Sequence, residues 1–143
     1  MRTLIILSIL CLAMSCRQAT SNESTLKITG MITDSITKAA LPNAKVTILA
    51  WYDAGFDKTD YVCIDTVTDN TGQFAATFDK GYKITVASVA TNYYPSIKSS
   101  ETDKNKSLAI NLMLKRKPSS ENDFDSTYKK INLTNYIIQN SDN

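Results

Sequence analysis

The residues able to do chemistry are few, and the type missing among them is histidine. The chain holds 14 Asp plus Glu, three Cys and no His. Without an imidazole it cannot build a Ser-His-Asp or Cys-His nucleophile, a histidine-ligated zinc site or an H-E-x-x-H helix. We therefore expect no catalytic residue, no metal and no cofactor, and interpret the chain as a non-enzyme.

Three acidic residues lie in one candidate binding loop. Asp53, Asp57 and Asp60 lie within residues 51–60, and carboxylate oxygens are the ligands that Ca²⁺ prefers. Their spacing is not that of an EF-hand, and acids in a solvated loop are common, so we interpret them as surface residues. A carboxylate pair could also serve a glycosidase, but a sandwich this short is not expected to form a deep cleft.

The same loop carries aromatic residues that could stack on a sugar ring or become buried in a protein partner. Trp51, Tyr52 and Phe56 lie within it, and Tyr93 and Tyr94 form a pair farther along the chain. We predict all of them as candidate ligand or partner contacts. Core or strand-end positions are the alternative for most of them.

Cys16 is the candidate lipidation residue. Residues 1–15 combine Arg2, an apolar run from Leu4 to Leu12 and a small residue at Ser15, a pattern typical of a secretory signal and too short to span a bilayer. Ser15-Cys16 resembles the end of a bacterial lipobox. We predict a signal peptide over 1–15, a lipid-anchored tether over 16–24 and a location in the cell envelope, at the outer membrane. Ordinary cleavage that leaves an unlipidated secreted protein is the alternative.

Charge and the remaining cysteine narrow the partner classes. The net charge of +2 is spread along the chain, so there is no basic stripe for nucleic-acid phosphates, and we exclude nucleic acid as a partner.

Cys63 has no partner within the chain once Cys11 leaves with the signal and Cys16 is acylated. We expect Cys63 to be a small buried apolar residue rather than a reactive thiol.

Most of the chain alternates apolar and polar residues with the period of a β-strand. Such runs cover 26–33, 45–50, 61–67, 73–78, 82–89 and 108–114, with turn residues between them. Short strands about ten residues apart predict an all-β fold, an antiparallel β-sandwich of about seven strands over residues 25–116. In the second run Val46, Ile48 and Ala50 should point inward, which puts Leu49 and Trp51 on the outer face.

Four segments within these runs form a longer pattern. They are Ile28 to Asp34, Ala40 to Val46, Thr68 to Phe74 and Gly81 to Val86. In this order and spacing they resemble the carboxypeptidase regulatory-like family, which implies a prealbumin-like (transthyretin-like) Greek-key sandwich. Domains of this family occur beside metallocarboxypeptidases, at the amino termini of TonB-dependent transporters and alone in lipoproteins of the Bacteroidota. The resemblance therefore implies an accessory module of the cell envelope.

One departure from the family pattern concerns backbone conformation. Asn92 stands before Tyr93 where the family often has Gly. Asn is the non-glycine residue that best tolerates a positive φ. We expect the backbone shape of the family to survive there.

Two kinds of modification are suggested by similar proteins. Collagen-adhesin B-type domains share this sandwich and often link a first-strand Lys to a last-strand Asn, but alternation turns Lys27 and Asn111 to solvent, so we expect no crosslink. Asp-Ser/Thr-apolar triplets resemble the sequence that receives O-glycans in exported Bacteroidota proteins. They make Ser35, Thr66 and Ser126 candidate glycosylation sites.

Residues 117–143 are predicted as a linker followed by a candidate extra strand. Ile131, Leu133 and Ile137 recur at even spacing, and we expect this tail to pack, in extended form, beside the outer face that carries Leu49 and Trp51. The sequence as a whole predicts a non-catalytic envelope lipoprotein that serves as an interaction or structural accessory. A glycan-binding lipoprotein of a polysaccharide-uptake system is the alternative.

Overall fold

The computed structural model of the protein describes residues 25–102, 107–118 and 132–140. Nearly all of its regular structure is β-strand, which confirms the all-β fold class. The elements in chain order are β1 (Leu26–Asp34), β2 (Lys45–Gly55), β3 (Lys58–Val67), β4 (Gln73–Phe78), β5 (Lys83–Val89), β6 (Ser96–Glu101), β7 (Ser107–Ala109), β8 (Leu112–Leu114) and the helix α3 (Leu133–Asn140).

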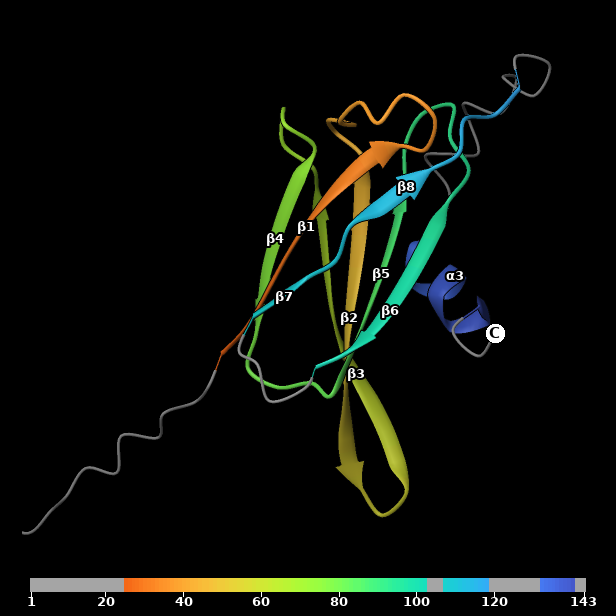
Figure 1. Cartoon of the computed structure of the whole chain (residues 1–143). Helices are drawn as coiled ribbons and strands as arrows, with labels where there is room; N and C mark the ends of the chain where they lie inside the picture. The colour runs from red at the N-terminus through yellow and green to blue at the C-terminus, as the bar shows by residue number, and fades with distance from the viewer. Residues whose placement is uncertain (1–24, 103–106, 119–131, 141–143) are drawn as a thin grey trace, which may run out of the picture.

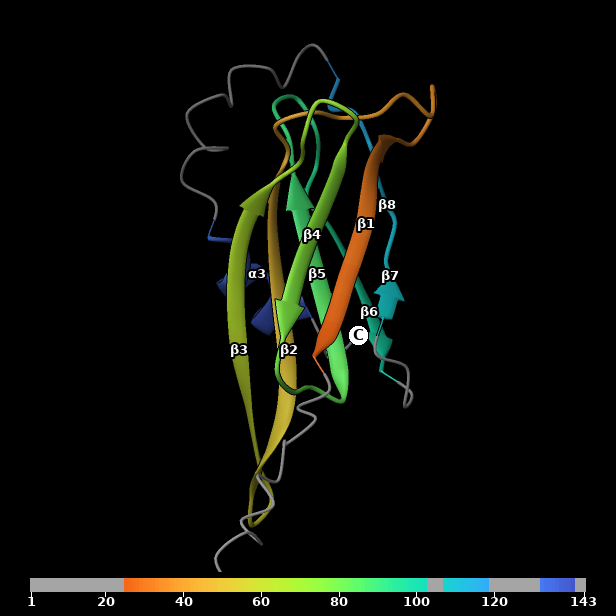
Figure 2. The same ribbon diagram turned by 90° about the vertical axis from the view of Figure 1, so that its left-hand side faces the viewer.

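The strands form two sheets that face each other as a sandwich (Figures 1 and 2). One sheet has the order β4-β1-β7, with β8 also paired to β1, and the other has the order β3-β2-β5-β6. The neighbours pair antiparallel except around β1, which runs parallel to both β7 and β8. The first strand therefore lies between the fourth strand and the last two.

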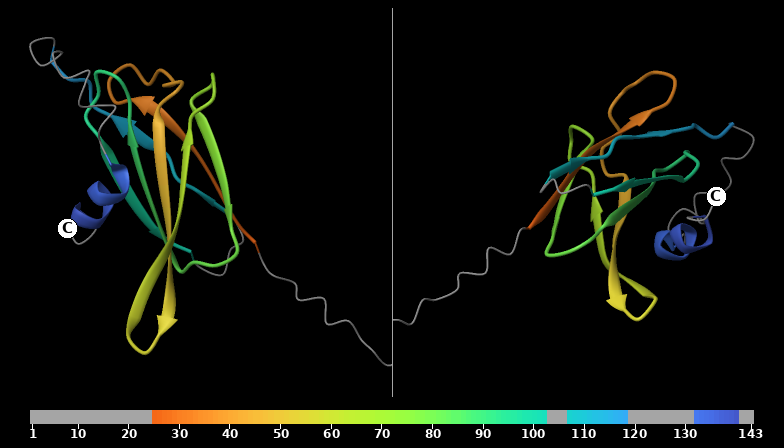
Figure 3. Two further views of the ribbon diagram at one scale, coloured as in Figure 1. Left: turned by 180° about the vertical axis from the view of Figure 1, so that it is seen from behind. Right: turned by 60° about the horizontal axis from the view of Figure 1, so that its bottom comes forward.

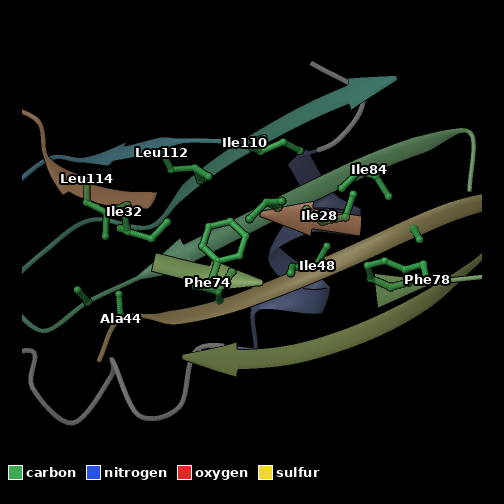
Figure 4. Packing of buried hydrophobic residues seen from close by; sticks show 14 of the residues in the cluster. Ile28, Ile32, Ala44, Ile48, Phe74, Phe78, Ile84, Ile110, Leu112 and Leu114 are labelled. Atoms are coloured by element: carbon green, nitrogen blue, oxygen red, sulfur yellow. The ribbon is translucent and has the colours of Figure 1, made fainter. Parts of the chain in front are cut away.

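The core lies between the sheets, where alternate side chains of both meet (Figure 4). Ile28 and Ile32 from β1 pack with Ile48 from β2 and Phe74 from β4, and all of them are buried. The inward direction of Val46, Ile48 and Ala50 is as the alternation predicts. Period-two patterning therefore positioned the core correctly.

Two backbone positions need their particular residues. A Cβ added to Gly30 would lie 2.0 Å from the carbonyl oxygen of Ile110 and 2.4 Å from Cζ of Phe74, so only glycine fits there. Asn92 has a φ of 65°, the left-handed conformation expected of it.

The strand β6 was not predicted. Its sequence, Ser-Ile-Lys-Ser-Ser-Glu, is polar, and it lies at an edge of its sheet, paired only to β5. Edge strands carry polar and charged residues because one side of their backbone faces solvent. The run predicted over 108–114 is divided at residues 110 and 111 into the two short strands β7 and β8.

The tail reaches the predicted place in a different form. Leu133 and Ile137 are buried against Leu49, Ala87 and Val89 on the outer face of the β2–β5 sheet (Figure 3). The segment is the helix α3, so the predicted extended form is wrong. Leu133 and Ile137 are four residues apart, a spacing that shares one face of a helix as well as one face of a strand.

The amino end of α3 is capped locally. Oδ1 of Asn132 accepts a 3.1 Å hydrogen bond from the backbone N–H of Asn135, the arrangement of a helix N-cap. No helix within the described ranges is long and apolar enough to cross a membrane.

Candidate functional site

The predicted loop over residues 51–60 is a projecting β-hairpin. β2 and β3 stay paired from Lys45 opposite Val67 to Gly55 opposite Lys58, whereas β5 accompanies β2 only as far as Trp51 opposite Lys83. Residues 52–61, the projecting hairpin, therefore extend past the rest of the sandwich, as the lower part of Figure 1 shows. The prediction of a loop over residues 51–60 is wrong for most of that range, because β2 continues to Gly55 and β3 begins at Lys58.

The turn of the projecting hairpin carries the most exposed apolar side chain described. Phe56 has a relative exposure of 102%. Phe56 and Asp57 both have positive φ, 47° and 56°, as the two central residues of a type I′ turn do. Bulky side chains rarely adopt this conformation, and Asn-Gly is the usual occupant of such a turn. The turn thus keeps the ring of Phe56 exposed to water, at a cost in backbone conformational energy.

The other two aromatic candidates of this region are covered. Trp51 is half-buried on the outer face, donates from Nε1 to Oγ1 of Thr85 at 3.0 Å and packs edge-on against Tyr61 with ring centroids 5.3 Å apart. The ring of Tyr52 has Nζ of Lys80 3.4 Å from its centroid. Of the three aromatic residues predicted as contacts here, Phe56 alone presents an open ring.

The acids of the hairpin serve its own backbone and side chains. Asp53 accepts from the backbone N–H of Gly55 at 2.8 Å, and Asp60 accepts from the hydroxyl of Tyr52 at 3.2 Å. Within residues 25–102, 107–118 and 132–140 there is no group of three or more His, Cys, Asp or Glu side chains that could hold a metal ion.

Tyr93 is buried, which is the core position given above as the alternative to a ligand contact. It is 8% exposed, and its hydroxyl donates to Oδ2 of Asp34 at 2.8 Å. Arg116 donates from its guanidinium to the same carboxylate at 3.3 Å and to the Tyr93 hydroxyl at 3.1 Å. Tyr94 is half-buried, with Nζ of Lys117 5.6 Å from its ring centroid. The alternation of apolar and polar residues could not reveal the contact between Tyr93 and Asp34, because these residues lie far apart in the chain.

The Asp34 carboxylate is held strongly in its charged form. Backbone hydrogen bonding from Thr37, then the Tyr93 hydroxyl and the N–H of Ile36, keep the pKa of Asp34 well below its ordinary value, with a smaller contribution from the charge of Arg116. Burial of the carboxylate acts in the opposite direction and is outweighed. The cluster fastens the end of β1 to the segment after β5, with Asp34 buried and the Arg116 side chain 62% exposed.

The groove beside α3 brings polar residues together. A groove of about 630 Å³ lies between the outer face of β2 and β3 and the start of the helix. Thr47 donates to Asp65 within it, and Thr134 borders it. No periodicity signal marks this groove, because it depends on where the helix docks.

Cys63 is exposed, not buried as predicted. β3 is an edge strand, so its outward side chains have a neighbour on one side only. The nearest partner of the thiol is Oγ1 of Thr134 at 3.6 Å. An alternating strand pattern does not distinguish an edge strand from a central one, which is why the burial of Cys63 was mispredicted.

The candidate modification sites are distributed over the molecule. Ser35 is half-buried just after β1, and Thr66 is half-buried within β3, whereas Ser126 and Cys16 lie outside the described residues. Lys27 and Asn111 are both exposed, as predicted, and Oδ1 of Asn111 accepts from the N–H of Met31, four residues along β1 from Lys27. The two side chains are not brought together.

Comparison with known proteins supports the fold. No family model matches the sequence, and no curated protein matches it significantly. Catechol 1,2-dioxygenase from Acinetobacter sp. ADP1 is similar in structure, with a TM-score of 0.53 and 14% identity over 69% of this chain and 55% of that chain. A mutant catechol 1,2-dioxygenase from Acinetobacter radioresistens gives a TM-score of 0.51 and 13% identity over 67% and 53%.

The C-terminal domain of the shaft pilin SpaA from Lactobacillus rhamnosus GG also matches. Its TM-score is 0.45, with 14% identity over 64% of this chain and 98% of that one. The present chain spans little more than half the length of the dioxygenases. At such identities the likeness to the dioxygenases concerns the fold alone, and it supports the β-sandwich.

Proposed function

We propose that the chain is a non-catalytic, lipid-anchored protein of the cell envelope, whose sandwich holds the projecting hairpin out to a partner. The observation that carries this proposal is Phe56, fully exposed at a left-handed turn beyond the end of both sheets. A backbone outlier that persists in a folded protein is a reason to look for function at that place. An exposed aromatic ring is a common anchor of an interface.

The family context of the proposal is the carboxypeptidase regulatory-like resemblance. Supporting it are the sandwich itself, the close approach at Gly30 and the left-handed Asn92. Gly30 lies in the first of the segments that carry the resemblance, and Asn92 stands where the family often has Gly. Family membership of this kind brings a scaffold and no catalytic machinery.

The anchor of the proposal is Cys16, acylated after removal of residues 1–15, with the protein attached to the outer membrane. The pattern of Arg2, the apolar run and Ser15-Cys16 supports it. Two or more acyl chains bind a membrane stably, because each buried methylene contributes about 0.8 kcal/mol.

The glycan-binding alternative has less support from the arrangement of the aromatic side chains. A sugar-stacking platform needs open ring faces. Trp51 is half-buried against Tyr61, and Tyr52 has Lys80 over its ring. Of the aromatic residues predicted in this hairpin, Phe56 alone remains open, and a single phenylalanine suits an apolar contact better than a sugar.

Photocrosslinking in cells tests the interaction role of the hairpin. Benzoylphenylalanine in place of Phe56 should give an adduct, whereas the same group in place of Val67 should not. Val67 is a matched control because it is 56% exposed and ends β3, the strand that follows the turn, at its far end from Phe56. Equal adduct yields at both positions, or none at either, would contradict an interaction site at the turn.

Phase partitioning tests the anchor separately. The natural chain should enter the detergent phase, and Cys16→Ser should move it to the aqueous phase. A natural chain found wholly in the aqueous phase would show that the anchor is absent.

A further inference from the structure

We propose that the partner of the projecting hairpin is the lipid surface itself, with Phe56 inserted into the interface of the membrane to which the chain is anchored. The proposal rests on the lipid anchor of the preceding section. It adds a second point of membrane contact, which would fix the orientation of the sandwich.

The first step of the argument is that the hairpin and the start of the sandwich lie at one end of the molecule. Leu26, the first residue of β1, pairs with Phe78 at the end of β4. Gly81, just beyond, fits between Leu26 and Ala50: a Cβ added there would be 3.6 Å from Cδ2 of Leu26 and 3.2 Å from Cβ of Ala50. Tyr82 then donates its N–H to the carbonyl of Trp51, at the base of the hairpin. Figures 1 and 3 show the same arrangement from three directions.

The second step concerns reach. About nine residues separate Cys16 from Thr25, and a chain of that length spans at most about 30 Å when fully extended. The hairpin runs from Trp51 to Phe56 beyond the sandwich, which is about 16 Å at the rise of a strand. The length of the hairpin is therefore of the same order as the longest distance that the tether allows between the sandwich and the bilayer. The turn can reach the bilayer while the tether holds the sandwich away from it.

The third step concerns charge. Among the described residues at this end, four basic and five acidic side chains nearly cancel, so their attraction to anionic lipid would be weak. An uncharged, fully exposed ring is then the feature available for lipid contact, and zwitterionic lipid should suffice. The charged residues concerned are Lys27, Lys58, Lys80 and Lys83 on one side and Asp53, Asp57, Asp60, Asp79 and Glu101 on the other.

The fourth step compares a lipid surface with a protein partner. A stable protein interface covers about 800 Å² on each partner, and a two-residue turn with one aromatic ring next to Asp57 is far smaller. A membrane contact needs no such area here, because the anchor already keeps the hairpin at high local concentration beside the bilayer. Shallow insertion into the headgroup boundary is the geometry that a short apolar projection permits.

Quenching by brominated lipid tests the contact directly. The lipidated full chain with Trp51→Phe and Phe56→Trp is reconstituted on phosphatidylcholine vesicles with and without bromine on the acyl chains. Bromine near the interface should lower the emission of the new indole about two-fold, as expected for shallow insertion. The matched control combines Trp51→Phe with Val67→Trp, at the opposite end of β3, and its emission should not change.

A second measurement avoids replacing Trp51. A nitroxide attached at Phe56→Cys in a Cys63→Ser background should become accessible to oxygen dissolved in the bilayer. A nitroxide at Val67→Cys should stay accessible to a water-soluble relaxation agent.

The outcomes separate the two proposals. Protein that floats with the vesicles while its residue 56 behaves like the residue 67 control overturns the lipid contact and leaves the anchor standing. Protein that fails to float overturns the anchor, and the lipid contact falls with it. Quenching that appears only with anionic lipid and vanishes in salt would also overturn the apolar insertion proposed here.

Discussion

The hydroxyl of Tyr93 donates a 2.8 Å hydrogen bond to Oδ2 of Asp34, a residue 59 positions earlier in the chain. Asp34 ends β1, and it is 2% exposed. The same carboxylate caps the following turn by accepting from Ile36 and Thr37 through Oδ1. One side chain thus joins a local turn to a distant segment.

Acid should destabilise the protein through Asp34. The folded-state pKa of Asp34 lies below its ordinary value of 3.8, so the stabilisation is complete above that value and is lost as the pH falls through it towards the folded pKa. Urea unfolding at pH 7 and pH 3 should show a smaller loss on acidification for Asp34→Asn than for the natural chain. Tyr93→Phe removes one donor and should give an intermediate loss. Identical acid sensitivity in all three proteins would contradict this role.

Gly30→Ala should destabilise the sandwich by about 1–3 kcal/mol, the usual cost of overpacking. The new methyl would meet the backbone oxygen of Ile110 and the ring of Phe74, and the backbone oxygen belongs to the strand segment hydrogen-bonded beside it. Thr29→Ala, at the exposed neighbouring position, is the control, and its change should stay below about 1 kcal/mol. Chemical unfolding measures both, and equal losses would refute the steric argument.

Ile137→Ala should loosen α3 from the sheet. Ile137 is fully buried, whereas its neighbour Ile138 is 44% exposed. Loss of buried methyl groups costs about 2–5 kcal/mol in a core, which is enough to undock a helix of eight residues. The fluorescence of Trp51, which packs against the same cluster, should shift to longer wavelength. Ile138→Ala should leave the emission unchanged, and a shift of equal size in both variants would count against helix docking.

Cys63 should react with a thiol reagent in the folded protein. The side chain is exposed on an edge strand, so a coloured disulfide reagent should modify it without denaturant. Cys63→Ser should abolish the signal. A thiol that reacts only after unfolding would show that it is covered.

Replacing the turn Phe56-Asp57 by Asn-Gly should stabilise the protein by about 0.5–1 kcal/mol, because those residues suit a type I′ turn without strain. Chemical unfolding measures the gain in unfolding free energy, and the variant also loses the exposed ring that carries the proposed contact. A stability–function exchange of this kind is common where a site holds strain. Unchanged stability would mean that Phe56 adopts its positive φ without measurable cost.

The extent of what sequence predicts differs between elements. β1 and β4 alternate and are buried mainly on one face, so their inward residues follow from period two. β2 is buried on both faces over residues 46–50, and there the sequence predicts which residues point inward but not that the outer face is covered. The polar edge strand β6 has no such signal. The tail was assigned the wrong element because Leu133 and Ile137 fit both periods, and only the cluster at Leu49 decides between them.

The sequence predicts the candidate site only in part, because composition does not show which side chains are covered. Residues 51–60 stood out by composition, yet composition could not separate a covered Trp51 from an exposed Phe56. That difference depends on where β5 stops pairing with β2, which is a property of the sheet. The base of the hairpin therefore packs against the sheet, while its turn is exposed to solvent.

The parallel pairing of β1 with β7 and β8 imposes an order on the folding of the chain during its synthesis. The hairpins β2–β3 and β5–β6 join neighbours in the sequence and can form as soon as each is synthesised. β1 emerges first, but Ile32 to Asp34 gain their parallel strand partner only when Leu112–Leu114 follows. Because closing so long a loop is slow, the earliest strand is among the last to be fixed in place, and a chain released before residue 112 would have one complete sheet and one incomplete sheet.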